Sequence, residues 1–255
     1  MSQSQSSFVW YELLTSDAAA AKSFYTAVVG WGIEDVPVLD MTYTLLKAGD
    51  VQVGGLIEMT KAAGAGGVKQ GWIGYIGVDD VDAMTQSVRQ NGGSVRRPPS
   101  DIPNTGRFSV VADPQGAPFY LFKPNRPGTP PPSTQPGQIG WRELHTTDWS
   151  AAFSFYSGLF GWTKDAALDM GPIGIYQLFV VTGEQSGGMF NSPAAGAGPY
   201  WQFYFLTDSV TAGAKRITDA GGRVLNGPMQ VPGGQWTVQA SDPQGAFFAL
   251  LSPKE

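Results

Sequence analysis

Cysteine is absent from this chain, and histidine occurs only once, as His145. The lack of cysteine excludes disulfides, thiolate zinc sites and a cysteine nucleophile. With a single histidine, one chain cannot supply a two-histidine, one-carboxylate iron site or a three-histidine zinc site. Of the common metal sites, a weak magnesium site made of carboxylates and water stays compatible with the composition.

Charge is scarce as well. Charged residues make up 15% of the chain, the formal net charge is −5, and the sequence pI is about 4.9. This acidic balance argues against nucleic acid or an anionic membrane surface as a partner. No apolar run approaches the roughly 20 residues of a membrane span, and residues 1–7 show no signal-peptide pattern but a loose polar tail. We therefore expect a cytoplasmic protein with neither membrane nor nucleic acid as a partner.

The segment WYELLTSD, which starts at Trp10, returns as WRELHTTD at Trp141. Each copy predicts a short strand followed by a helix, with Asp17 or Asp148 as the N-cap that accepts a backbone N–H. Both helices then carry Phe-Tyr and end at Gly-Trp in the same register. The similarity continues through most of the chain, which predicts a duplicated domain.

The same order of elements is predicted after each of these helices. A hairpin comes first, followed by a strand, a second helix, and two strands joined by the type I turn sequence Asp-Pro-Gln-Gly. The predicted ranges are 43–59, 72–78, 81–90 and the turn 113–116 in the first half, and 176–191, 201–207, 210–219 and the turn 242–245 in the second. Between the halves, residues 125–136 are rich in proline, which favours an extended linker.

This order of landmarks, found twice, resembles the vicinal oxygen chelate superfamily, which includes glyoxalase I, bleomycin-resistance proteins and extradiol dioxygenases. The chain is most similar to the two-domain bacterial glyoxalase-like branch. The resemblance implies an α+β fold of tandem duplicated glyoxalase-like domains, each made of two βαβββ modules with curled mixed sheets around a cleft. The expected boundaries are a tail at 1–7, domain 1 at 8–124, a linker at 125–136 and domain 2 at 137–255.

The resemblance also implies positions for a divalent metal ion in the cleft, and this chain departs from the family at them. The first-strand positions hold Trp10 and Trp141, where metal enzymes of the family carry His, Gln or Glu. The other positions hold Ile73, Gln202, Tyr120 and Ala249. Of these side chains, only Gln202 could coordinate a metal. We therefore expect no metal site of the family type and no cofactor.

Aromatic residues replace the metal ligands. Because side chains alternate along a strand, Trp10, Glu12 and Leu14 should share one face, as should Trp141, Glu143 and His145. The predicted ligand-binding residues are Trp10, Glu12, Tyr75, Tyr120, Trp141, Gln202 and Tyr204. An aromatic cleft with a few polar groups suits a small hydrophobic or aromatic ligand. The alternative is that the tryptophans simply fill a cleft that has lost its use.

Glu12 and Glu143 stand inside otherwise apolar strands, where a carboxylate is costly to bury unless it is paired or protonated. One of them could be a general base with a raised pKa. Both could equally be structural, bonded to backbone or to a tryptophan N–H across the pseudo-twofold axis. His145 has no counterpart in the first half, where Leu14 stands, although a lone histidine is often structural. Glu143 and His145 are the predicted catalytic candidates.

Two functions of different classes follow. In the first, the protein binds and sequesters a small hydrophobic or aromatic molecule, as a monomer or homodimer, without the metal site. In the second, it is an enzyme, either a glyoxalase-like lyase or isomerase or a hydroxylase or other oxygenase, that uses Glu143 and His145 or a recruited divalent metal. The sequence identifies neither the ligand nor which of the two clefts is active.

Overall fold

The computed structural model describes residues 6–38, 41–60, 69–126, 134–192 and 198–255. Most of the predicted tail and most of the predicted linker, at 127–133, lie outside these residues. The first repeat contains β1 (Phe8–Thr15), α1 (Ala18–Val29), β2 (Gly32–Val38), β3 (Met41–Ala48), β4 (Val51–Glu58), β5 (Gly71–Gly77), α3 (Val81–Gln90), β6 (Ser94–Ile102), β7 (Gly106–Ala112) and β8 (Pro118–Pro124).

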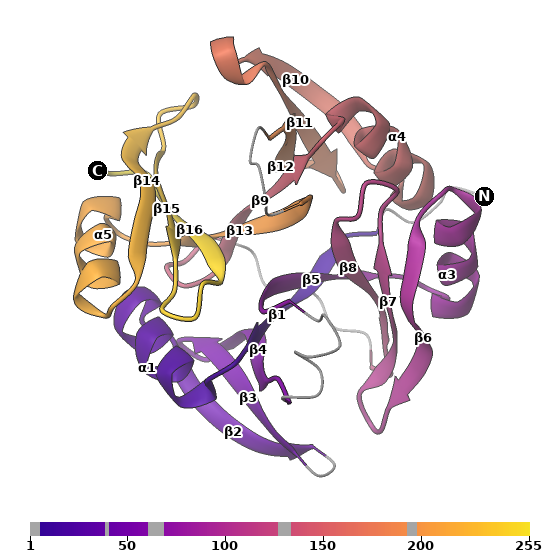
Figure 1. Cartoon of the computed structure of the whole chain (residues 1–255), viewed down its shortest axis with the longest axis horizontal. Coiled ribbons are helices and arrows are strands. Elements are labelled where there is room, and N and C mark those ends of the chain that lie inside the picture. Colours follow the sequence, from indigo (N-terminus) through magenta and orange to yellow (C-terminus); the bar gives the residue numbers. More distant parts are fainter. Residues whose placement is uncertain (1–5, 39–40, 61–68, 127–133, 193–197) are drawn as a thin grey trace. The chain divides into compact units, whose positions relative to one another are not determined.

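The second repeat follows the same plan (Figure 1). It contains β9 (Ile139–Thr146), α4 (Trp149–Phe160), β10 (Thr163–Asp169), η1 (Gly171–Ile173), β11 (Ile175–Val181), β12 (Glu184–Asn191), β13 (Tyr200–Leu206), α5 (Val210–Asp219), β14 (Arg223–Gln230), β15 (Trp236–Ser241) and β16 (Phe247–Ser252). None of the helices in the described ranges is long and apolar enough to span a bilayer.

Strand order repeats along with element order. One mixed sheet runs β2-β3-β4-β1-β5-β8-β7-β6 and the other β10-β11-β12-β9-β13-β16-β15-β14. In each sheet the first and last strands of a module pair in parallel, as β1 does with β4 and β9 with β12, while the hairpins are antiparallel. The predicted α+β fold, with two copies that each contain two βαβββ modules, is confirmed.

Local chemistry explains where the first helix of each repeat begins and ends. The side chain of Asp17 accepts from the backbone N–H of Ala20 at 2.9 Å, and Asp148 caps α4 in the same way. At the other end, Gly30 and Gly161 adopt left-handed conformations with φ of 84° and 72°. Glycine reaches this region without the steric cost that a Cβ would bring, so each helix stops at the predicted residue.

In space, the described chain forms two compact units that each take one module from each repeat. Unit 1 contains Met1–Val9, Ile73–Pro130 and Arg142–Trp201, and unit 2 contains Trp10–Trp72, Pro131–Trp141 and Gln202–Glu255. Helices α3 and α4 pack together in unit 1, as α1 and α5 do in unit 2. The predicted domain boundaries, 8–124 and 137–255, follow the two sequence repeats. They divide the chain differently from these two spatial units, and they stay a prediction.

The core of unit 2 is organised around Tyr25 of α1, which is fully buried. Its hydroxyl accepts from the Trp72 indole N–H at 2.8 Å and donates to the Asp242 carboxylate at 3.2 Å. Asp242 belongs to a turn from the other repeat, so this chain of hydrogen bonds joins the two modules of the unit. Burial raises the pKa of Tyr25 and that of Asp242, because each loses solvation of its charged form.

Unit 1 contains the same arrangement. Tyr156 of α4 accepts from the Trp201 indole N–H at 3.0 Å and donates to Asp113 at 3.2 Å. The other oxygen of Asp113 accepts from the backbone N–H groups of the Asp-Pro-Gln-Gly turn, which explains why an aspartate opens that turn. Burial raises the pKa of Asp113 as well. Each unit therefore has a buried Trp–Tyr–Asp connection between modules of different repeats.

Candidate functional site

In unit 2, the predicted residues Trp10 and Glu12 lie together on β1, joined by a tyrosine from β3. The indole N–H of Trp10 donates to the Tyr43 hydroxyl at 2.9 Å, and that hydroxyl donates to Glu12 Oε2 at 3.1 Å. Glu12 is only 3% exposed. Its register partner on β4 is Gly55, where an added Cβ would lie 1.9 Å from the Tyr43 oxygen. The glycine thus makes room for the tyrosine that holds the carboxylate.

Unit 1 contains the matching arrangement around Glu143 of β9. The Tyr176 hydroxyl, from β11, donates to Glu143 Oε2 at 2.8 Å. Gly188 of β12 stands in register with Glu143, and a Cβ there would come within 2.1 Å of the Tyr176 ring. The interpretation of both glutamates as structural predicted a backbone or tryptophan partner. A tyrosine hydroxyl, which that interpretation did not name, donates to the glutamate in both repeats, because the neighbouring glycine lets the ring lie over the sheet.

His145 distinguishes the second repeat from the first. Its Nε2 lies 2.9 Å from Glu143 Oε1, close enough for an ion pair, but without the alignment of a hydrogen bond. The imidazole stacks on the Tyr200 ring with centroids 4.4 Å apart, and it meets the edge of Phe190 at 4.8 Å. Nδ1 lies 3.3 Å from the Ser192 hydroxyl. The ring therefore contacts a carboxylate, two aromatic rings and a hydroxyl, all of unit 1.

The electrostatics of this cluster centre on the Glu143 carboxylate. Burial and the charge of Glu143 together raise the pKa of Tyr200, so its hydroxyl keeps its proton. Glu143 and His145 are 6% and 7% exposed. A carboxylate and an imidazole in contact, shielded from water, are the groups that general acid–base chemistry requires. The arrangement can accept a hydrogen bond or a proton from a bound molecule.

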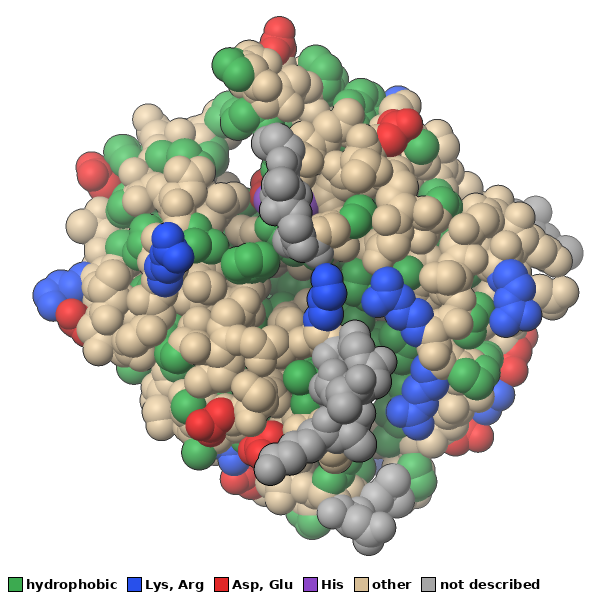
Figure 2. All heavy atoms as spheres, viewed as in Figure 1, with side chains coloured by type: hydrophobic (Ala, Val, Ile, Leu, Met, Phe, Trp, Pro, Cys, Tyr) green, Lys and Arg blue, Asp and Glu red, His purple; other side chains and the backbone are tan. Residues whose placement is uncertain are grey.

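The predicted residues Tyr75 and Tyr120 come together in unit 1. They stand in register on β5 and β8, and their rings meet edge to face with centroids 4.3 Å apart. Phe108 of β7 lies 6.0 Å from Tyr120, and the Arg97 guanidinium lies 4.7 Å above the Phe108 ring. On the face seen in Figure 2, several Lys and Arg side chains lie over the region of β6 to β8. This strand face is aromatic with a cationic margin.

In unit 2, the predicted residues Trp141 and Tyr204 pack together. Tyr204 forms a buried cluster with Ala249 and Leu251, and Trp141 covers it. The Gln239 amide donates to the Tyr204 hydroxyl at 3.0 Å. Gln202, on the same strand as Tyr204, is 4% exposed. The sequence missed Tyr43, Tyr176, Tyr200 and Ser192. The sequence feature that could have identified Tyr43 and Tyr176 is that each lies in a predicted hairpin whose second strand contains a Gly-Gly pair.

The donor set does not fit the divalent metal ion that the resemblance implies. Two of the implied positions hold Trp10 and Trp141, and a tryptophan has no lone pair to offer a metal. Tyr120 and Ala249 stand at the implied carboxylate positions, within aromatic and aliphatic packing. Within the described ranges, no group of three or more His, Cys, Asp or Glu residues is arranged to hold a metal ion.

Comparison with known proteins places the chain in a family. The model of the Glyoxalase/Bleomycin resistance protein/Dioxygenase superfamily matches residues 7–121 and 138–250. A protein of Mycobacterium bovis named "Putative glyoxylase CFP32" is 34% identical over 247 residues, which is 96% of this chain and 94% of that protein. The anthracycline biosynthesis protein DauV of a Streptomyces species is 29% identical over 259 residues, covering 96% and 93%.

Among solved structures, the Mn(II)-bound glyoxalase from Novosphingobium aromaticivorans aligns with a TM-score of 0.64 at 20% identity, covering 99% of this chain and 83% of that one. At this level of identity the likeness concerns the fold. The family match spans both repeats, and the mycobacterial relative matches over nearly its whole length. The chain belongs to the Glyoxalase/Bleomycin resistance protein/Dioxygenase superfamily.

Proposed function

We propose that this protein binds a small aromatic or hydrophobic molecule on its aromatic strand faces, without the metal site of the family. The observation that carries the proposal is the pair of buried carboxylates, Glu12 and Glu143, each held by a tyrosine hydroxyl. They stand on the strands where the resemblance places the first metal ligands. There they are oriented hydrogen-bond acceptors beside aromatic rings.

The chemistry of the strand faces supports this proposal. Tyr75 and Tyr120 in unit 1, and Trp141 and Tyr204 in unit 2, offer ring surfaces for stacking or edge contacts. Small-molecule sites combine such apolar surface with a few fixed polar groups. The polar groups here are Glu12, Glu143 and the amide of Gln202. A ligand with a planar ring and a hydroxyl donor would meet both requirements.

The test is a titration of metal-depleted protein with a dihydroxyanthraquinone, followed by tryptophan fluorescence and calorimetry. The name of the Streptomyces relative guides the choice of a polycyclic aromatic probe. We expect saturable binding that is the same with and without EDTA, and no stoichiometric Zn²⁺, Ni²⁺, Mn²⁺ or Fe²⁺ by elemental analysis. One tightly bound metal ion per chain, with ligand binding lost on its removal, would overturn the proposal.

A second candidate function is favoured by the asymmetry between the repeats. Only Glu143 has a histidine beside it, since the position of His145 is Leu14 in the first repeat. A carboxylate–imidazole pair can remove a proton from an acidic C–H group and return it to the same or a neighbouring carbon. The protein would then be a lyase or isomerase of glyoxalase type that uses its own side chains.

This alternative predicts proton exchange. A bound α-hydroxy ketone should take up deuterium from D₂O at its acidic carbon in the presence of the wild type. His145→Leu, which installs the residue of the first repeat, should abolish that exchange. Glu12→Gln is the matched control, because it changes the corresponding carboxylate that lacks a histidine. Exchange that survives in His145→Leu would eliminate this pair as the catalyst.

The proposal also includes a cytoplasmic location and a monomer or homodimer in solution. The oligomeric state is measured by light scattering of the purified chain. Cell fractionation tests the location, and recovery in a secreted or membrane fraction would contradict it.

A further inference from the structure

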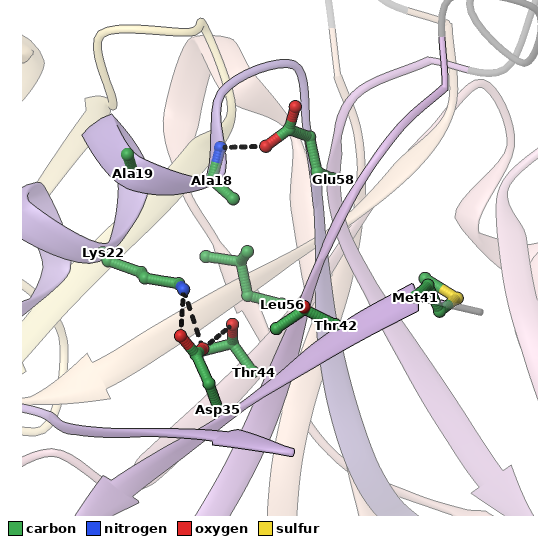
Figure 3. A pocket seen from close by; sticks show the side chains of 9 residues that line it. All are labelled: Ala18, Ala19, Lys22, Asp35, Met41, Thr42, Thr44, Leu56 and Glu58. Atoms are coloured by element: carbon green, nitrogen blue, oxygen red, sulfur yellow. Dashed lines mark hydrogen bonds and ion pairs between the residues drawn. The ribbon is translucent and has the colours of Figure 1, made fainter. Parts of the chain in front are cut away.

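A pocket of about 420 Å³ lies within unit 2, between the N-terminal part of α1 and the strands β2, β3 and β4 (Figure 3). Thr42 and Thr44 line it, and they alternate along β3 with Tyr43, whose hydroxyl bonds to Glu12. Because neighbouring strand residues point to opposite faces, the pocket is on the helix side of the sheet and apart from the Glu12 cluster. Its volume lies within the range of sites for small molecules.

The polar groups of this pocket carry a surplus of negative charge. Lys22 Nζ lies 2.7 Å from both carboxylate oxygens of Asp35, and the Thr44 hydroxyl donates to Asp35 at 2.6 Å. These bonds hold the pKa of Asp35 below its usual value. Glu58 Oε2 accepts from the backbone N–H of Ala18 at 3.1 Å. The pocket lining therefore contains two carboxylates and one ammonium group, beside the apolar side chain of Leu56.

In the second repeat, aromatic side chains stand at the positions that correspond to this pocket. When the two helices are aligned on their N-cap aspartates, Ala18 corresponds to Trp149, and Lys22 corresponds to Phe153. The ammonium of Lys164 lies 5.2 Å from the centroid of each of these two rings. This distance allows a favourable cation–π contact. Aromatic rings and an ammonium thus occupy this face in unit 1.

The two carboxylates are absent from that second copy. Thr44 pairs with Asp35 across β2 and β3, whereas the corresponding Gln177 pairs with Ala167. Asn191 replaces Glu58 and accepts from the Trp149 N–H at 2.7 Å. The first repeat therefore has space where the second has rings, and it has two carboxylates beside its ammonium where the second has neither.

We propose that the pocket of unit 2 binds an aromatic amine, a planar ring that carries an ammonium group. The ring would lie against Leu56 and Ala18, in the space that the Trp149 side chain takes in the other repeat. The ammonium would lie near Glu58 and Asp35. This site is independent of the ligand proposed for the aromatic strand faces.

The experiment is a calorimetric titration of the full chain with tryptamine, which combines an indole ring with an ammonium group. We expect saturable binding with one site per chain. Indole-3-acetate, with the same ring and the opposite charge, should bind at least about tenfold more weakly. Absence of tryptamine binding, or equal affinity for the two compounds, would overturn the proposal.

Substitutions in and outside the pocket test whether tryptamine binds there. Ala18→Trp fills the pocket with the residue of the second repeat, and it should reduce tryptamine affinity at least about tenfold. Ala27→Trp adds the same ring at an exposed position of α1 outside the pocket and should leave affinity unchanged. Glu58→Gln keeps an acceptor for Ala18 and should weaken binding about three- to fivefold, as for an exposed ion pair. If Glu143→Gln abolishes binding while Ala18→Trp and Glu58→Gln do not, tryptamine binds elsewhere and the inference is wrong.

Discussion

The Glu12 cluster of unit 2 and the Glu143 cluster of unit 1 share a scaffold and differ in what surrounds it. In both, a tyrosine hydroxyl donates to the carboxylate and a glycine in the neighbouring strand makes room for its ring. Two positions after Glu12 stands Leu14, which has no polar group. Two positions after Glu143 stands His145, which contacts the carboxylate itself.

This difference separates what both repeats share from what only the second repeat has. A feature that the duplication keeps in both copies, such as the tyrosine–glutamate bond over glycine, satisfies a buried carboxylate wherever the module occurs. A feature found in one copy has no such general role. The scaffold therefore accounts for why glutamate stands in an apolar strand, and the Glu143–His145 contact is the place to look for chemistry particular to this protein.

The largest effect is expected from filling the space under the tyrosine. Gly188→Ala adds a Cβ within 2.1 Å of the Tyr176 ring, so the ring or the strand must move. Overpacking of this kind costs about 1–3 kcal/mol of unfolding free energy. Gly55→Ala, against Tyr43, should cost a similar amount. The control is Gly158→Ala on α4, where an added Cβ meets nothing within 4 Å. Chemical denaturation measures all three, and equal stabilities would contradict the role of the two glycines.

Next in size is removal of the tyrosine hydroxyls. Tyr43→Phe removes the donor to Glu12, and Tyr176→Phe removes the donor to Glu143. At about 0.5–1.5 kcal/mol for a lost hydrogen bond, each variant should be less stable than the wild type. Thermal unfolding measures both losses. A variant as stable as the wild type would mean that its hydroxyl does not stabilise the buried carboxylate.

Much of the fold could be predicted from the sequence because its signals are local. The helices at 81–90 and 210–219 occur with the predicted bounds, and the glycines end α1 and α4 as expected. The strands β2, β6, β10 and β14 were missed. Most of their side chains are exposed, so the alternation of apolar and polar residues that marks a half-buried strand is weak or absent.

The candidate site was only partly predictable. Strand alternation placed Glu143 and His145 on one face, and their contact agrees with that prediction. The bond between Glu143 and Tyr176 joins residues 33 positions apart, and it depends on the register of β9, β12 and β11. No local pattern fixes such a register. Whether these residues bind or catalyse stays a prediction.

A third comparison concerns Trp141, which packs against the cluster of Tyr204, Ala249 and Leu251. If Trp141 contacts the ligand, Trp141→Ala should weaken binding roughly tenfold, about 1.4 kcal/mol. Replacing a fully buried tryptophan by alanine costs about 3–5 kcal/mol of unfolding free energy. The loss for Trp141→Ala should be smaller, because Trp141 is only partly buried. A large fall in melting temperature, with no ligand found for the wild type, would show that the side chain only fills space.

The smallest effect concerns pH and compares the two buried connections between modules. Burial raises the pKa of Asp113 and of Asp242, so each carboxyl binds its proton more tightly in the folded chain than in the unfolded chain. The corresponding stabilisation is fully present below the unfolded pKa of about 3.9, and it is lost as the pH rises through the folded pKa. Each unit of pKa difference amounts to at most about 1.4 kcal/mol.

Urea unfolding from about pH 4 upward, compared between the wild type and Asp113→Asn, isolates this contribution because other groups titrate equally in both. The wild type should lose more stability with rising pH than the variant does, and Asp242→Asn should behave alike in unit 2. An opposite slope would show that the backbone N–H groups of the turn stabilise the charged carboxylate more than burial destabilises it.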